Sequence, residues 1–186
     1  MVRISEASEA GVPAGLAVAT PGGWRDMSAL RPGALIWAAT GAVRLLGLRR
    51  SRGAERMLLP PGALGNRNAL WLPPGLRVLI DCDMAEAICG EALVLVPVAA
   101  AEGWRGVRRV AAPAPLVVPL LERAAVIHAG PGMMLACPGI VPGGLRDGPG
   151  FAELSEGTAR QMLACEMAEE AGAALAALRR SWSAGR

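Results

Sequence analysis

Short apolar runs separated by Gly and Pro dominate the chain from Leu16 to about Pro142. The runs are LAVAT (16–20), ALIWAAT (34–40), AVRLLGL (42–48), RMLLP (56–60), LRVLI (76–80), ALVLVPV (92–98), VRRVA (107–111), LVVPLL (116–121) and AAVIHAG (124–130). Many short strands at regular spacing predict an all-β domain. The second and third runs are separated by a glycine, which predicts a hairpin. Pro97 and Pro119 lie inside two runs, so we expect edge, bulged or interrupted strands there.

The pattern changes to a helical one after Gly150. The sequence TARQ reads as a capping box, with Thr158 at the N-cap and Gln161 at the third helical position. Apolar residues then recur three and four apart, which predicts an amphipathic C-terminal helix of about six turns. This stripe could pack on the β-domain, or it could be exposed and bind another subunit. Its members are Leu163, Met167, Ala171, Ala174, Leu178 and Trp182.

Composition narrows the class of protein. The 186 residues suffice for one domain with or without a small appendage, and 53% of them are hydrophobic, with a mean hydropathy of +0.37. No run of about 18 uncharged apolar residues exists, so we expect no membrane span. The extra apolar surface should therefore lie in a core or in a partner interface. The first segment, MVRISEASEAG, has no apolar h-region, so we expect no secretory signal and a cytoplasmic location.

All basic residues are arginines, and the net charge is only +3. The densest group lies between Arg44 and Arg56. A nucleic-acid surface usually has a larger basic patch with stacking aromatic residues, so the charge does not favour nucleic acid as a partner. Nucleic-acid binding by this group would show a steep salt dependence.

The potential metal ligands are few and widely spaced. The cysteines are Cys82, Cys89, Cys137 and Cys165, no CxxC pair exists, and His128 is the one histidine. This spacing predicts no zinc site and no cofactor, and it favours buried free thiols. Three carboxylates follow the run at 76–80, and we interpret them as a solvated turn rather than a hard-cation site: Asp81, Asp83 and Glu86.

Four segments, in this order and at these intervals, resemble bacterial Hint (hedgehog/intein) domains. They are ATPGGWRDMSALRPGALIW (19–37), GALGNRNALWLPPGLRVLI (62–80), CGEALVLVPVAAAEG (89–103) and LVVPLLERAAVIHAG (116–130). The resemblance covers roughly residues 11–139, and it implies an all-β fold of many short strands. It also implies self-processing, in which a first Cys or Ser attacks the preceding carbonyl and a Thr/Ser-x-x-His segment protonates the scissile amide.

The positions that carry this chemistry are occupied here by residues that cannot perform it. By the resemblance, the nucleophile falls on Gly11, or on Ala10 with a gap of one residue. The serine and histidine of the Ser-Pro-x-His segment fall on Leu72 and Gly75, and a later histidine falls on Ala124. Loss of the nucleophile together with its histidine removes the acyl shift. We therefore expect a degenerate member without catalytic residues, and not an enzyme.

The predicted organisation is an N-terminal tail (1–10), a Hint-like β-domain (11–142), and a linker with the C-terminal helix (143–186). The predicted function is a catalytically inactive structural or protein-binding component, on its own or within a larger assembly. Its interface would be the stripe of Leu163, Met167, Ala171, Leu178 and Trp182, used with a protein partner or in a homo-oligomer.

The alternative is a residual self-cleaving protein that uses Ser8 or a cysteine as the nucleophile. A pair of a cysteine with His128 is the least favoured version, because a nucleophile needs its base within hydrogen-bond reach.

Overall fold

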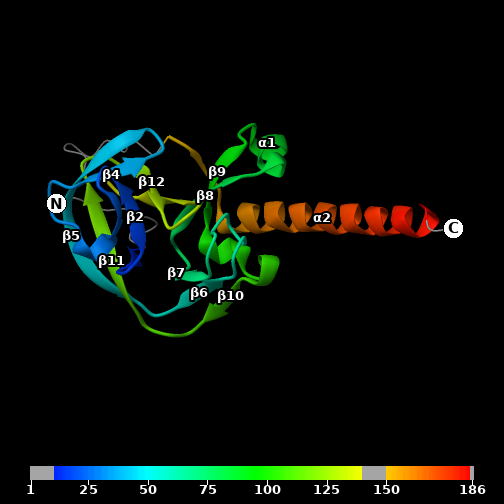
Figure 1. Ribbon diagram of the computed structural model, residues 1–186, viewed down its shortest axis with the longest axis horizontal. Helices are drawn as coiled ribbons and strands as arrows, with labels where there is room; N and C mark the ends of the chain where they lie inside the picture. Colours follow the sequence, from blue (N-terminus) through cyan, green and yellow to red (C-terminus); the bar gives the residue numbers. More distant parts are fainter. Residues whose placement is uncertain (1–10, 140–149, 185–186) are drawn as a thin grey trace.

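The computed structural model describes residues 11–139 and 150–184. The described strands form one sheet of eleven strands and one of three. A long helix, α2 (Glu156–Ala184), projects away from this β-domain, and its C-terminal end lies far from the strands (Figure 1). An all-β domain followed by a C-terminal helix is confirmed.

The larger sheet runs in the order β1-β11-β5-β4-β12-β13-β8-β9-β14, and β2 pairs with both β12 and β3. All of its pairs are antiparallel except β14 with β9. Its strands are β1 (Val12–Pro13), β2 (Ala17–Thr20), β3 (Gly23–Asp26), β4 (Leu35–Ala38), β5 (Gly41–Gly53), β8 (Arg77–Asp81), β9 (Leu93–Pro97), β11 (Ala114–Leu121), β12 (Ala125–Ala129), β13 (Met133–Cys137) and β14 (Ala152–Glu153).

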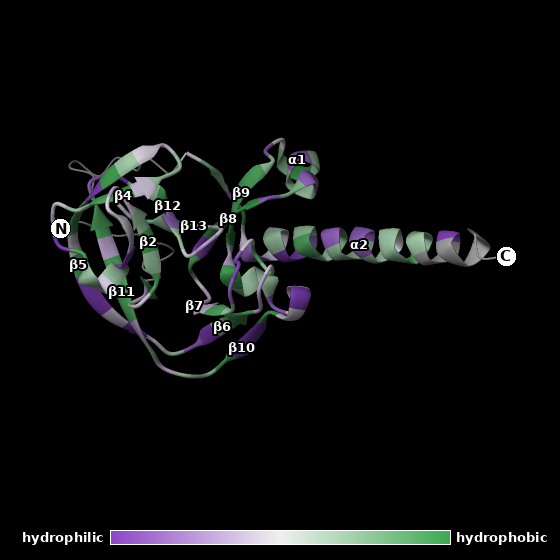
Figure 2. Ribbon diagram, in the orientation of Figure 1, coloured by the Kyte–Doolittle hydropathy of each residue, from purple (hydrophilic) through white to green (hydrophobic). Residues whose placement is uncertain are grey.

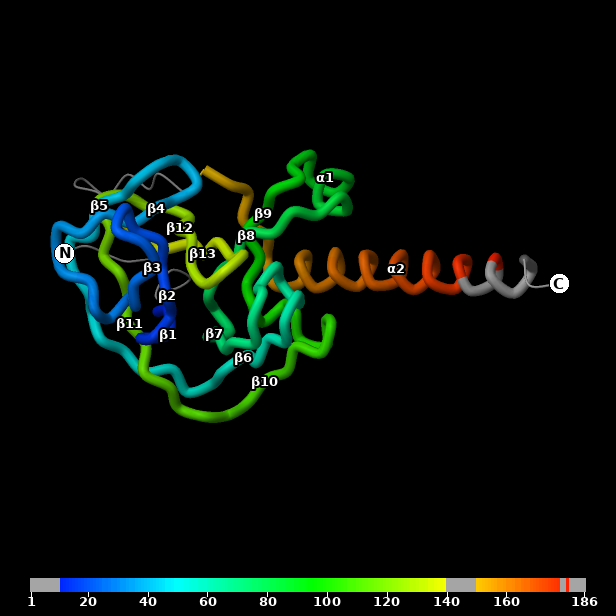
Figure 3. The backbone as a smooth tube through the Cα atoms, viewed as in Figure 1, coloured from blue at the N-terminus to red at the C-terminus, as the bar shows by residue number. Residues whose placement is uncertain are grey.

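The smaller sheet has the order β10-β6-β7 and is joined to the larger one by the long strands β5 and β11. These two strands pair from Ala114↔Gly53 to Leu121↔Leu45. The chain runs from β5 into the small sheet and returns from that sheet into β11 (Figure 3). The strands of the smaller sheet are β6 (Arg56–Leu59), β7 (Leu70–Leu72) and β10 (Arg108–Val110). The short helical segments are η2 (Met27–Ala29), α1 (Asp83–Cys89), η3 (Val98–Ala101) and η4 (Trp104–Gly106).

The apolar runs predicted the strands well where glycine or proline bounds them. β4 and β5 form the expected hairpin, with Ala38 paired to Gly41. Pro119 lies just before a register shift between Leu120 and Leu121, as expected for an irregular strand near a proline. β9 ends at Pro97.

Several elements were not predicted, and β13 and α1 are two of them. Residues Met133–Cys137 form β13, which pairs with both β12 and β8 in the larger sheet. The carboxylates Asp83 and Glu86 lie in the first turn of α1, and the prediction of a solvated turn there is wrong. Negative charge stabilises a helix N-terminus, and Gly90 ends the helix with a left-handed φ of 76°.

Helix α2 begins earlier than predicted. Ser155 Oγ accepts a hydrogen bond from the Thr158 backbone N–H at 3.1 Å, so Ser155 caps the helix and the prediction of Thr158 as N-cap is wrong. Ala159, Met162 and Leu163 are buried. By contrast, Met167 is 48% exposed and Ala171 is also exposed, so the stripe does not pack on the β-domain beyond Leu163. The side chains at 178 and 182 lie outside the described part of the chain.

Asn66 is a polar side chain buried in the loop between β6 and β7, and it is 1% exposed. Its Oδ1 accepts a hydrogen bond from Leu64 N at 3.0 Å. Its Nδ2 donates to the carbonyl oxygens of Pro60 at 2.8 Å and Asn68 at 2.9 Å. One amide therefore satisfies three backbone groups and fixes the path of this loop.

Replacement of Asn66 by Ala is expected to lower the free energy of unfolding by about 2–3 kcal/mol, because partly buried backbone groups lose their partners. Urea denaturation measures this change. Asn68→Ala is the matched control, since that side chain is exposed and should change stability by less than about 0.5 kcal/mol. Equal effects of the two substitutions would contradict the structural role of Asn66.

Candidate functional site

Gly11, the position predicted for the nucleophile, is buried directly before β1. The next residue, Val12, pairs with Val117 of β11. A Cβ atom at Gly11 would lie 3.0 Å from the carbonyl oxygen of Val117 and 3.1 Å from the Cβ of Leu116. Packed atoms rarely approach so closely, so a side chain would require β1 or β11 to shift. A side chain at this position therefore fits only if its neighbours move by a few tenths of an ångström.

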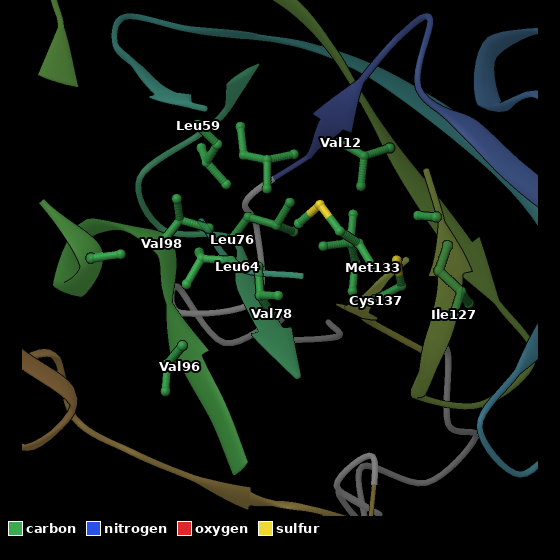
Figure 4. Close-up of a cluster of buried hydrophobic side chains, with 14 of the residues drawn as sticks. Val12, Leu59, Leu64, Leu76, Val78, Val96, Val98, Ile127, Met133 and Cys137 are labelled. Carbon is green, nitrogen blue, oxygen red and sulfur yellow. The ribbon is translucent and has the colours of Figure 1, made fainter. Parts of the chain in front are cut away.

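Leu72 ends β7 and is fully buried. β7 lies in contact with β1, so the structure does bring the positions of Gly11 and Leu72 into one region. This region is filled with apolar side chains, and Figure 4 shows Val12, Leu76 and Met133 among them. An acyl shift needs polar groups that stabilise charge, and this packing supplies none.

Gly75 lies in an exposed turn in which the Leu76 backbone N–H donates to the Pro73 carbonyl oxygen at 3.2 Å. Two further backbone hydrogen bonds tie the turn to η3: Ala99 N to Pro74 O and Val98 N to Leu76 O, both 2.9 Å. The histidine position of the resembled motif is thus a rigid backbone turn here.

Ala124 is half-buried directly before β12. A Cβ at Gly139 would overlap the backbone of Arg123 and Ala124, so these two segments lie in close contact. The backbone at the second histidine position of the motif is therefore packed tightly against Gly139.

All four cysteines have free thiols, of which two are buried (Cys82 and Cys137) and two are exposed (Cys89 and Cys165). Burial raises the pKa of the Cys137 thiol to about 12, and burial is also the largest cause that raises the pKa of Cys82. A protonated thiol is a poor nucleophile at neutral pH. Cys89 and Cys165 are exposed, so the expectation of buried thiols is wrong for these two.

His128 is half-buried on β12, opposite Met134 of β13. In the described parts of the chain no hydrogen bond joins it to a cysteine, so nothing supports a cysteine–histidine pair.

Residues 11–139 and 150–184 contain no group of three or more His, Cys, Asp or Glu placed to hold a metal ion. Over the same residues, no helix combines the length and apolarity that crossing a bilayer requires.

The arginines between 44 and 56 are spread over β5 and β6. Arg44 approaches Glu122 at 3.9 Å, and the Arg56 guanidinium lies 5.4 Å from the centre of the Trp71 ring. Arg50 and Arg52 line a shallow groove of about 500 Å³ with Ser28. Nucleic-acid binding by this group stays untested.

A cleft of about 440 Å³ lies at the base of α2, between the helix and the β-domain. Its lining includes Asp81, Cys82, Trp104, Leu163 and Glu166. Cys82 Sγ donates to a Glu166 carboxylate oxygen at 3.4 Å, which engages both groups. Burial raises the pKa of the Cys82 thiol, so this thiol–carboxylate pair favours the protonated thiol rather than an activated nucleophile.

Arg105 borders this cleft and was missed by the sequence analysis. Its guanidinium lies 4.8 Å from the centre of the Trp104 ring, bonds to Glu170 of α2 and donates to the Gly62 carbonyl oxygen at 3.2 Å. Its backbone has a φ of 42°, the one positive φ among the described residues other than glycine. Such a conformation is uncommon and strained for an arginine, so these contacts must hold it in place.

No protein-family profile matches the chain, and no curated protein matches its sequence. Among solved structures, the chain is similar to a gp41-1 intein carrying three substitutions, at 13% identity and a TM-score of 0.45. That likeness covers 69% of this chain and 98% of the intein. A variant of the MchDnaB-1 intein is similar at 13% identity and a TM-score of 0.45, covering 68% of this chain and 99% of the intein. Inteins belong to the group that the sequence motifs resemble. At TM-scores below 0.5, this likeness indicates no function.

Replacement of Gly11 by Ala is expected to lower the free energy of unfolding by about 1–2 kcal/mol, because the added methyl group crowds the Val117 carbonyl. Gly15→Ala is the matched control: a Cβ there meets nothing within 4 Å, and the lower chain entropy of alanine should leave stability unchanged or slightly higher. Thermal and urea unfolding of both variants measure the difference. A neutral Gly11→Ala would show that room for a side chain exists.

The buried thiol predicts a pH dependence of stability. The folded state keeps the Cys137 proton up to a pKa of about 12, whereas the unfolded thiol ionises near its ordinary value of 9.0. The free energy of unfolding should therefore be unaffected below about pH 9 and fall between about pH 9 and 12, by up to about 1.4 kcal/mol per pH unit. Denaturant unfolding at several pH values should show a shallower fall for Cys137→Ala. An unchanged slope would contradict this origin.

Proposed function

We propose that the chain is a Hint-like domain without self-processing chemistry that acts as a structural or protein-binding component. The observation that carries this proposal is that Gly11 and Gly75, at the positions of the nucleophile and its histidine, have no side chain, and that Gly11 lies in tight contact with Val117. The apolar packing of Val12, Leu72 and Leu76 supports it, because no group in that cluster can stabilise a developing charge. A domain that has lost its chemistry can persist through the surface that it presents.

Helix α2 is the surface that we propose for docking. Past Leu163 its described side chains are exposed, apart from a half-buried Glu166. Met167 is 48% and Leu175 is 59% exposed, and hydrophobic residues alternate with charged ones along the helix (Figure 2). Apolar side chains on a helix that its own domain does not cover are typical of helix-mediated recognition.

The base of α2 is fixed to the β-domain by several contacts. Arg160 donates to the Ala99 carbonyl oxygen at 3.2 Å, Glu166 accepts from Cys82, and Glu170 pairs with Arg105. These contacts follow one another along the helix, so they set its direction as well as its position. A helix held in one direction loses less entropy on binding than a flexible tail does.

The alternative, residual self-cleavage, has less support. Ser8 lies outside the described residues, and burial favours the protonated thiols of Cys82 and Cys137. The cytoplasmic location stays a prediction.

Intact-mass measurement of the purified chain tests the loss of chemistry. We expect the full-length mass, unchanged by added thiol or hydroxylamine, because no activated ester can form. Fragments that end near residues 8–11 would overturn the proposal and favour self-cleavage.

Affinity capture of proteins from the native source tests the docking surface, with the wild-type chain and the Met167→Glu variant as baits. We expect a bound protein, either a partner or another copy, that the variant fails to retain. Ile88→Glu is the matched control, since Ile88 is equally exposed at 48% but lies on α1. Equal capture by wild type and Met167→Glu, or no association by capture, gel filtration and crosslinking, would contradict docking through α2.

A further inference from the structure

Two arginines of β5 line the groove of about 500 Å³ described above, and neither has a partner in the described part of the chain. Arg50 and Arg52 are exposed, and within residues 11–139 and 150–184 no hydrogen bond, ion pair or aromatic ring engages either guanidinium. Other arginines of the same residues do form ion pairs with glutamates. These arginines are Arg44, Arg77, Arg105, Arg109 and Arg160.

The two guanidinium groups lie on the same side of β5. Side chains alternate along a strand, so residues 50 and 52 share a face, and their Cα atoms are about 7 Å apart. Arg50 is paired with Val117 of β11, and Arg52 is paired with Pro115. Two long side chains at this spacing reach the same ligand beside β11.

The strands that form this groove carry positive charge without compensation. β1, β5 and β11 contain four arginines and no acidic residue. The carboxylates that follow β5 and β11 in sequence are Glu55 and Glu122. Arg109 engages Glu55 at 2.7 Å, and Arg44 engages Glu122 at 3.9 Å, so neither is available to Arg50 or Arg52. An uncompensated positive field in a groove favours an anionic ligand.

One edge of β5 is also open beside the groove. β11 pairs with β5 from Leu45 to Gly53, whereas β4 covers the opposite edge only from Gly41 to Arg44. No other strand of the described chain pairs with β5. A ligand therefore reaches the arginines along this edge without displacing a strand.

The number of guanidinium groups selects the charge of the anion. Guanidinium forks bind phosphate and carboxylate groups through paired hydrogen bonds. A phosphate monoester carries a charge of about −1.5 to −2 at pH 7, which two arginines match. Carboxylates and phosphodiesters carry one negative charge each. Ser28 also lines the groove, and its hydroxyl has no hydrogen-bond partner among the described residues.

The size and lining of the groove indicate that the ligand is more than a phosphate ion. A volume of about 500 Å³ lies within the range of roughly 300–1,000 Å³ typical of small-molecule sites. The surface beside the arginines is apolar and includes Ala14, Pro115 and Leu116. Such a surface suits an apolar or aromatic group attached to the phosphate.

We propose that this groove binds a small organic phosphate monoester. The phosphate lies between Arg50 and Arg52, and the organic group lies against Pro115 and Leu116. This site goes beyond the proposed function and does not depend on it. β5 and β11 lie on the side of the β-domain away from α2, so the ligand site and the docking surface are separate (Figure 1).

Isothermal titration calorimetry of the full chain with phenyl phosphate tests the site. We expect saturable binding of one ligand per chain, which Arg50→Gln and Arg52→Gln each weaken by at least about tenfold, since each removes a charge-assisted hydrogen-bond pair. Arg52→Lys keeps the charge without the fork and should weaken binding to a smaller extent. Thermal unfolding without ligand should be the same for these variants, because both arginines are exposed.

Arg108→Gln is the matched control. Arg108 is exposed on β10 and does not line the groove, so the same loss of charge there should change the affinity by less than about twofold.

Three further probes test the chemistry of the ligand. Benzoate keeps the ring but carries one charge, and inorganic phosphate keeps the charge but lacks the ring, so we expect both to bind more weakly than phenyl phosphate. Affinity for phenyl phosphate should fall below about pH 6, where the phosphate is protonated, whereas arginine keeps its charge. A single-stranded oligonucleotide should also bind more weakly, because its phosphodiesters carry single charges.

The site is overturned if millimolar phenyl phosphate shows no saturable binding or if both glutamine variants bind as wild type does. Equal affinity for benzoate or for inorganic phosphate would overturn the monoester as the ligand. Tighter binding of the oligonucleotide through the same arginines would overturn it in favour of nucleic acid. None of these results changes the intact-mass or capture measurements, so failure of this site is distinct from failure of the proposed function.

Discussion

The approach of Gly11 to the carbonyl oxygen of Val117 is the contact on which the interior depends. It lets β1 lie close against β11, and it brings Val12 into the core beside Leu72 and Leu76. The same contact leaves little space for a side chain directly before β1. The atoms that pack β1 against β11 therefore also crowd the volume that a side chain at Gly11 would occupy.

The rest of the β-domain is organised around strands that bridge its two sheets. β5 and β11 run from the large sheet toward the small one, and β1 pairs with β11 along this path. Displacement of β1 would thus disturb both sheets. For this reason Gly11 can matter for stability although it has no side chain.

Buried apolar side chains hold helix α2 to the β-domain, and polar contacts set its direction. Met162 and Leu163 are almost fully buried, and burial of such side chains contributes about 1.5–3 kcal/mol each. The exposed pair of Arg105 with Glu170 contributes at most about 1 kcal/mol. The pair therefore matters for the direction of α2 more than for its stability. The strained Arg105 backbone places the guanidinium where it contacts Trp104, Gly62 and the helix together. Apolar contacts hold the helix to the domain, and the arginine fixes where it points.

The sequence by itself determined the strands bounded by glycine and proline, the C-terminal helix, and the absence of reactive side chains at Gly11, Leu72, Gly75 and Ala124. These follow from local conformational limits and from residue chemistry, which need no tertiary contact. Only the tertiary structure decided that Gly11 is crowded by Val117, that Arg105 borders the base of α2, and that the helix leaves the domain after Leu163. Each of these depends on residues distant in sequence meeting in space, and a periodic apolar pattern does not tell whether its own domain will cover it.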